Sequence, residues 1–166
     1  MKTTTRKYVY RWLIGSLTAI SILSFAGAAQ ASSWKGLEPF VSKRADVERA
    51  MGTPASEGPN GSLNFTVAGG TVSISFVDQN FVKSKKLRPE VEGTVLQIIL
   101  QHESSSDTPE SMNLVKNGDF VRDKTKEALI YRNLKEGIIY TFIGDRLRTT
   151  RYTFSEKQIR VARHGR

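Results

Sequence analysis

The apolar positions of the first ordered segment predict one helix. Val47, Ala50 and Met51 are spaced three and four residues apart, as on one face of a helix. We therefore predict a helix over residues 43–51, with Ser42 as the N-cap whose hydroxyl accepts a hydrogen bond from an unpaired backbone N–H. A glycine and a proline follow at once, and these residues end a helix.

Two alternating segments separated by a glycine pair predict a β-hairpin. In residues 63–67 and 72–76 every second side chain is apolar, which is typical of strands with one buried face. Gly69 and Gly70 lie between them and accept the positive φ angles of a tight turn. We predict that these strands bury one shared set of side chains: Leu63, Phe65, Val67, Val72, Ile74 and Phe76.

The remaining pattern predicts more sheet. Residues 78–93 are polar and rich in lysine, which favours a loop. Residues 94–101 are almost continuously apolar, which predicts a central strand buried on both faces. After a Ser-rich connection at 102–112, shorter alternating segments predict further strands at 119–123, 128–132, 138–143 and 146–154.

These elements together predict an α+β fold. We expect an antiparallel β-sheet of about six strands that packs against one N-terminal helix. Residues 32–166 have the length of a single domain. An organisation in two similar lobes, 32–101 and 113–166, stays open, with the connection at 102–112 as their boundary.

The first thirty-one residues have the three-part pattern of a secretory signal peptide. A cationic segment without acids is followed by an apolar stretch from Trp12 to Phe25 and by the small-residue cleavage pattern Ala29-Gln30-Ala31. We predict cleavage after Ala31 and a periplasmic or extracellular location. The alternative is an uncleaved anchor, which would also place the remaining chain outside the cytoplasm. No later segment is apolar for long enough to cross a membrane.

The net charge of +9 is unevenly distributed. Residues 1–31 hold four cations, and residues 32–142 hold 14 cations and 14 acids, so the excess charge of the predicted domain is C-terminal. Such asymmetry points to an anionic partner, whereas nucleic acid is disfavoured because aromatic residues are not interleaved with the cations. A solvated edge strand with a basic tail is the alternative. The candidate anion contacts are Arg146, Arg148, Arg151, Lys157, Arg160, Arg163 and Arg166.

Few residues in the chain are suited to catalysis or metal binding. There is no cysteine, so thiol chemistry and disulfides are excluded. The two histidines, His102 and His164, are far apart in sequence and do not form a metal-ligand pattern. Serine-nucleophile motifs and phosphate-binding loops are also absent from the sequence. We therefore predict no cofactor, no metal and no catalytic residue, while a hydrolase that uses His102 stays open as an alternative.

The segment Asp46-Val47-Glu48-Arg49-Ala50-Met51-Gly52-Thr53-Pro54, followed by a loop and a hairpin, carries a family resemblance. Residues 42–77 resemble the helix–turn–hairpin element of the SmpA/OmlA (BamE-like) envelope proteins, related copies of which build the β-lactamase-inhibitor-protein fold. The resemblance implies an α+β fold and an envelope setting, and no functional residue is transferred. This chain lacks the lipid-accepting cysteine of the lipoprotein members.

We accordingly predict an exported, non-catalytic binding or envelope-associated protein. Its partner is expected to be an anionic envelope surface or another protein, contacted through the basic C-terminal end. An inhibitor-like protein that docks an enzyme through its sheet or loops is the second possibility.

Overall fold

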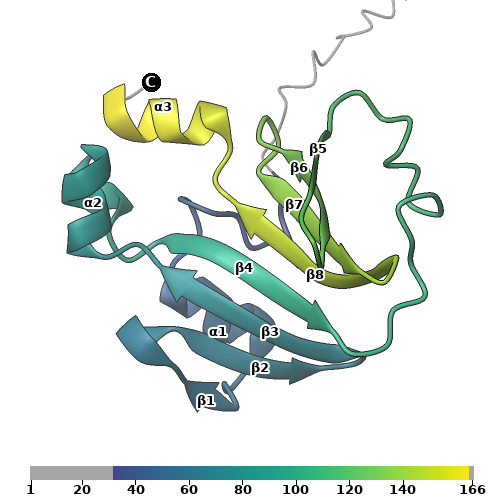
Figure 1. Ribbon diagram of the computed structural model, residues 1–166. Coiled ribbons are helices and arrows are strands. Elements are labelled where there is room, and N and C mark those ends of the chain that lie inside the picture. The colour runs from purple at the N-terminus through teal and green to yellow at the C-terminus, as the bar shows by residue number, and fades with distance from the viewer. Residues whose placement is uncertain (1–31, 165–166) are drawn as a thin grey trace, which may run out of the picture.

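The computed structural model describes residues 32–164, which build one antiparallel sheet (Figure 1). The eight strands lie in the order β1-β2-β3-β4-β8-β7-β6-β5. Strands β4 and β8 are neighbours, so the first and second halves of the chain meet at the centre of the sheet. The strands are β1 (Ser56–Glu57), β2 (Leu63–Val67), β3 (Gly70–Phe76), β4 (Val95–His102), β5 (Val121–Lys124), β6 (Leu129–Asn133), β7 (Ile138–Ile143) and β8 (Arg146–Thr153).

Three α-helices accompany the sheet: α1 (Arg44–Met51), α2 (Gln79–Lys85) and α3 (Glu156–His164). Short 3-10 turns η1 (Pro59–Gly61) and η2 (Pro89–Val91) complete the elements. The α+β class and the antiparallel sheet are thus confirmed, but six strands and one N-terminal helix were too few. The predicted signal peptide, residues 1–31, and Arg166 lie outside the described residues.

The missed elements are polar and short. Strand β1 has two residues, both exposed, and carries no alternating pattern. Helix α2 lies within the predicted lysine-rich loop, and Val82 is its only buried residue. The N-cap of α2 is Asp78, whose carboxylate accepts a hydrogen bond from the Phe81 N–H at 2.7 Å. Helix α3 begins with a reciprocal capping pair, because the backbone N–H groups of Ser155 and Gln158 each donate to the other residue's side chain.

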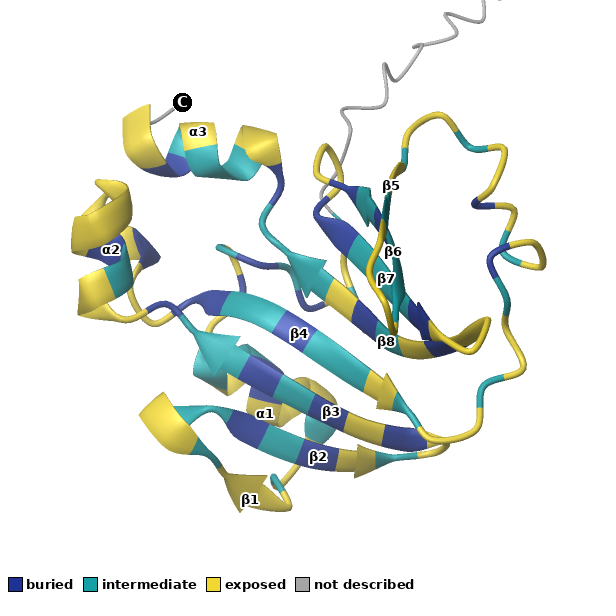
Figure 2. Ribbon diagram, viewed as in Figure 1, coloured by how far each residue is buried: buried dark blue, intermediate teal, exposed yellow. Residues whose placement is uncertain are grey.

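One face of the sheet, here called the covered face, holds the core of the first half. It carries Leu63, Phe65, Val72, Ile74 and Ile98, all buried, and α1 packs Val47 against them. In Figure 1, α1 lies behind β3, and Figure 2 shows buried and more exposed residues alternating along β2 and β3. The predicted hairpin is confirmed with its apolar side chains in this cluster, where Val67 and Phe76 are partly buried.

The start of α1 differs from its prediction. The N-cap is Lys43, whose N–H donates to the Asp46 carboxylate at 2.8 Å. Ser42 instead accepts a hydrogen bond from the Glu38 N–H at 2.9 Å, so its hydroxyl closes the preceding turn. Ala50 is exposed, because Val47 and the partly buried Met51 already provide the contact with the sheet.

The covered face continues into the second half, where a long connection takes the place of a helix. Leu114, in the segment between β4 and β5, packs against Tyr131, Phe142 and Leu147. The segment is also tied to β8, because the Leu147 N–H donates to the Asp107 carbonyl at 3.0 Å. The connection that we predicted as a boundary is therefore packed on the sheet along part of its length.

The opposite face, here called the open face, carries polar residues. Ser73 and Ser75 of β3 stand opposite Ile99 and Gln97 of β4, and Arg151 of β8 follows beside Ile99. All five are partly or fully exposed. The prediction that the central strand is buried on both faces was therefore wrong: β4 is central, but Val95 and Ile98 are its only buried residues, and Gln97 and Ile99 on the open face are partly exposed.

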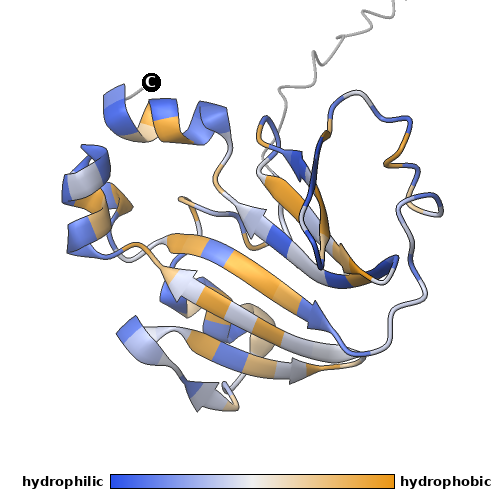
Figure 3. Cartoon of the chain, in the orientation of Figure 1, coloured by the Kyte–Doolittle hydropathy of each residue, from blue (hydrophilic) through white to orange (hydrophobic). Residues whose placement is uncertain are grey.

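A third apolar cluster joins α2 to α3 at one end of the sheet. Val82 of α2 and Ala162 of α3 are buried together with Val77, Leu87 and Val91. In Figure 3 both helices are largely hydrophilic with few hydrophobic residues. This packing places residues 79–91 beside residues 156–164, although about seventy positions separate them in the chain.

Candidate functional site

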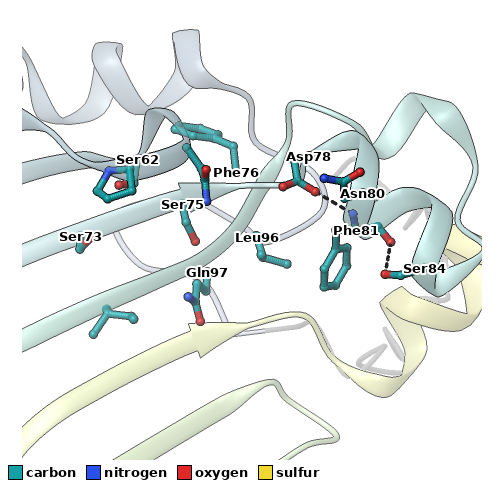
Figure 4. Close-up of a pocket in the computed structure, with 13 residues that line it drawn as sticks. Ser62, Ser73, Ser75, Phe76, Asp78, Asn80, Phe81, Ser84, Leu96 and Gln97 are labelled. Carbon is teal, nitrogen blue, oxygen red and sulfur yellow. Dashed lines mark hydrogen bonds between the residues drawn. The ribbon is translucent and has the colours of Figure 1, made fainter.

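A pocket of about 620 Å³ opens on the open face beside α2 (Figure 4). This volume lies within the range of about 300–1,000 Å³ that is usual for small-ligand sites. The pocket, here called the polar pocket, is lined mainly by neutral hydrogen-bonding side chains, with four large apolar residues and one carboxylate. Its residues are Pro59, Asn60, Ser62, Ser73, Ser75, Phe76, Asp78, Asn80, Phe81, Ser84, Leu96, Gln97 and Ile99.

The floor of the polar pocket is set by strand register. Ser75 stands opposite Gln97, and Ser73 stands opposite Ile99, so β3 and β4 present a row of short polar groups with one aliphatic side chain. Figure 4 shows the side chains of Ser75 and Gln97 on the same side of the strands. The Ser75 hydroxyl oxygen is buried without a hydrogen-bond partner, which leaves its hydrogen-bonding capacity unused.

The wall of the polar pocket is an aromatic ring held in place by α2. The Phe81 N–H donates to Asp78, and the Ser84 hydroxyl donates to the Phe81 carbonyl at 3.0 Å. The Phe81 ring makes edge contacts with Phe40 and Phe154, whose own rings stack at 4.6 Å between centroids. These contacts fix the ring that borders the pocket.

A second hollow, of about 410 Å³, lies between α2 and α3 and is cationic. We call it the cationic cleft; Ser84, Lys85, Lys86, Arg163 and His164 line it. The Arg163 Nε donates to the Lys85 carbonyl at 3.1 Å, which joins the end of α2 to α3.

Further cations lie on the same two segments. Lys83 is in α2 and Arg88 follows it, while Lys157 and Arg160 are on α3; all four are exposed. The Arg88 N–H donates to the Ala162 carbonyl at 2.9 Å, which holds the two basic segments together.

The candidate anion contacts do not form one group. Arg146 and Arg148 donate to the carbonyls of Ser106 and Glu103 at 2.6 and 3.2 Å, so they anchor the long connection at the far end of β8. Arg151 lies on the open face, opposite Ile99 of β4. Lys157, Arg160 and Arg163 are brought together on α3, and Arg166 lies outside the described residues.

The cations in and directly after α2 are the functional candidates that sequence reasoning missed. Lys83, Lys85, Lys86 and Arg88 are four cations without an acid between them, which is a visible signal in the sequence. Their relation to α3 depends on the burial of Val82 and Ala162 in one cluster, and no local pattern reveals that contact.

His102 is neither isolated in solvent nor part of a described hollow. It is partly buried on the covered face, and its Nε2 lies 3.0 Å from the Thr150 hydroxyl. Thr150 is buried, and neither residue lines the polar pocket or the cationic cleft. Burial lowers the pKa of His102, and the Asp107 carboxylate acts in the opposite direction. The contact between His102 and Thr150 therefore links β4 to β8.

We expect His102 to make the protein less stable in mild acid. Because its pKa is lowered in the folded state, the unfolded chain binds this proton first as pH falls through about 6.5. The free energy of unfolding should therefore fall below that pH, and His102→Gln should reduce the slope. Urea unfolding of both proteins across this range measures the effect, and an unchanged slope would contradict it.

In residues 32–164 no group of three or more acidic, histidine or cysteine side chains is arranged to hold a metal ion. Within the same residues no helix combines the length and the apolar character needed to cross a membrane. Comparison of the chain with protein-family models, with curated proteins and with solved structures finds no match.

Proposed function

We propose that this chain is an exported, non-catalytic binding protein whose cationic cleft contacts an anionic envelope surface. The observation that carries the proposal is the convergence of Lys85 and Lys86 with Arg163 in one hollow. The signal-peptide pattern of residues 1–31 and the resemblance of residues 42–77 to envelope proteins support the setting.

The cations of the cleft are available for a partner. Within residues 32–164 the ion pairs lie around α1 and β1 and among β5, β6 and their flanking loops, and none includes a cleft cation. Glu156 is the one acid of α3, at its first turn and away from the C-terminal Arg163. An anionic lipid surface attracts each nearby lysine or arginine by about 1 kcal/mol. Several such contacts from two elements therefore give useful affinity.

Removal of two cleft charges should weaken binding to anionic vesicles. The double variant Lys85→Gln/Lys86→Gln should lose about 2 kcal/mol, or roughly 30-fold in affinity. Arg160→Gln/Arg163→Gln should lose a similar amount, because both helices contribute. Co-sedimentation with phosphatidylglycerol vesicles measures both, with phosphatidylcholine vesicles as the neutral surface. Binding should also weaken as salt rises, because the Debye length is about 10 Å at 0.1 M and shorter above it.

A matched control is available at the opposite end of β8. Lys124 and Lys126 are exposed and lie beside the β7–β8 turn, whereas α3 follows the other end of β8. Lys124→Gln/Lys126→Gln changes the net charge equally and should leave vesicle binding almost unchanged. Equal loss in the control would show that net charge alone acts. If vesicle binding weakened in Arg160→Gln/Arg163→Gln but not in Lys85→Gln/Lys86→Gln, the result would contradict a binding site formed by both α2 and α3.

A further inference from the structure

The polar pocket has a chemical character that the cationic cleft does not share. No lysine or arginine lines it, so it provides no positively charged side chain for an anion. Its one carboxylate, Asp78, caps α2 and accepts a hydrogen bond from the Phe81 N–H at 2.7 Å. One of the two carboxylate oxygens is therefore already hydrogen-bonded within the protein. The remaining polar lining consists of hydroxyl and amide groups, which both donate and accept. The lining therefore matches an uncharged ligand with several hydroxyl groups.

The ligand must also have an apolar side. Phe81, Leu96 and Ile99 line the same pocket as the hydroxyl and amide groups. A purely apolar ligand would bury the Gln97 amide without a partner, which costs about 1–3 kcal/mol, and would leave the Ser75 hydroxyl unpaired, as it already is. A sugar ring combines hydroxyl groups at its edge with C–H groups on its faces, and so satisfies both kinds of lining.

Recognition of a peptide by strand addition is excluded at this position. Strand β3 is paired on both sides by β2 and β4, and β4 is paired on both sides by β3 and β8. Their backbone groups are occupied in the sheet, so an extended peptide finds no free edge here. Only side chains are left to make the contacts.

We infer that the polar pocket binds a neutral saccharide. The Ser75–Gln97 pair forms its hydrogen-bonding floor, and Phe81 forms the wall against which a ring face packs. Arg151 borders this surface as the cross-strand neighbour of Ile99, but it is not part of the lining. The inference is independent of the anionic partner proposed for the cationic cleft.

Calorimetric titration of the purified protein with cellotetraose, maltotetraose and chitotetraose tests the inference. At least one of these neutral saccharides should bind, and Ser75→Ala/Gln97→Ala should weaken that binding by roughly tenfold or more. Thr71→Ala/Gln101→Ala is the matched control, because Thr71 and Gln101 form another cross-strand pair on the same face and lie outside the pocket. This control should bind as the unchanged protein does.

Several outcomes would overturn the inference. These are no binding of any of the three saccharides, binding that survives Ser75→Ala/Gln97→Ala, and equal loss in the Thr71→Ala/Gln101→Ala control. Circular dichroism and thermal unfolding of both variants check that each is folded; if the pocket variant is not, Gln97→Ala alone takes its place with the same criterion. Vesicle binding by Ser75→Ala/Gln97→Ala should be unchanged, which separates failure at this pocket from failure at the cationic cleft.

Discussion

Phe142→Ala should lower the free energy of unfolding by about 3–5 kcal/mol. Phe142 is 0% exposed and lies at the centre of the second half of the covered face. Its ring meets the Tyr131 ring edge-on at 5.9 Å, and β8 places Leu147 opposite it. Truncation removes this contact area and leaves a cavity that the surrounding strands cannot close, because the sheet pairing holds their spacing.

The adjacent residue is the control for this effect. Ile143 follows Phe142 in β7 and is 49% exposed. Ile143→Ala should change the free energy of unfolding by much less, because a substitution on an exposed position away from a packed feature has effects within about 0.5 kcal/mol. Urea unfolding of both variants measures the difference. Similar losses would contradict the placement of Phe142 in the core.

Gly70→Ala should destabilise the protein by about 3 kcal/mol or more, as overpacking typically costs about 1–3 kcal/mol and exceeds that where backbone must move. A Cβ atom at Gly70 would lie 1.8 Å from the Gln101 carbonyl oxygen. That oxygen belongs to the backbone of β4, so no side-chain rotation relieves the contact. The strands β3 and β4 would have to separate at the start of their pairing.

The neighbouring glycine separates crowding from backbone strain. Gly69 has φ +82°, and nothing lies within 4 Å of a Cβ atom placed there. Gly69→Ala should therefore show only the cost of a left-handed conformation, about 1–2 kcal/mol. Thermal and urea unfolding of the two variants measure the difference. A loss at Gly69 equal to that at Gly70 would contradict the close approach of β3 to β4.

The local pattern was sufficient where one face of an element is buried. The alternation around Gly69 and Gly70 predicted the β2–β3 hairpin, and the spacing of Val47 and Met51 predicted α1. These predictions hold because side-chain periodicity and burial coincide in these elements. Two details of α1 were wrong: Ala50 is small enough to stay outside the contact, and the N-cap is Lys43, not Ser42.

The local pattern failed where an element has little apolar surface. Helix α2 was predicted as a loop because its sequence has no repeated apolar spacing. The helix is instead held by one buried residue, Val82, and by the Asp78 cap. Strand β4 was predicted to be buried on both faces, since Leu96 and Ile99 make it look continuous. Partial exposure of such side chains on an open sheet face cannot be distinguished in sequence from burial beneath a helix.

Sequence alone determined the α+β class, the antiparallel sheet, the first hairpin and the exclusion of thiol chemistry, because these follow from composition and short-range periodicity. Only the tertiary structure decided which charged and polar residues meet. It brought Lys85 and Lys86 to Arg163, joined Arg146 and Arg148 to backbone carbonyls of the long connection, and aligned Ser75 with Gln97 beside Phe81. Those contacts join residues distant in sequence through strand register and buried packing, which no local pattern specifies.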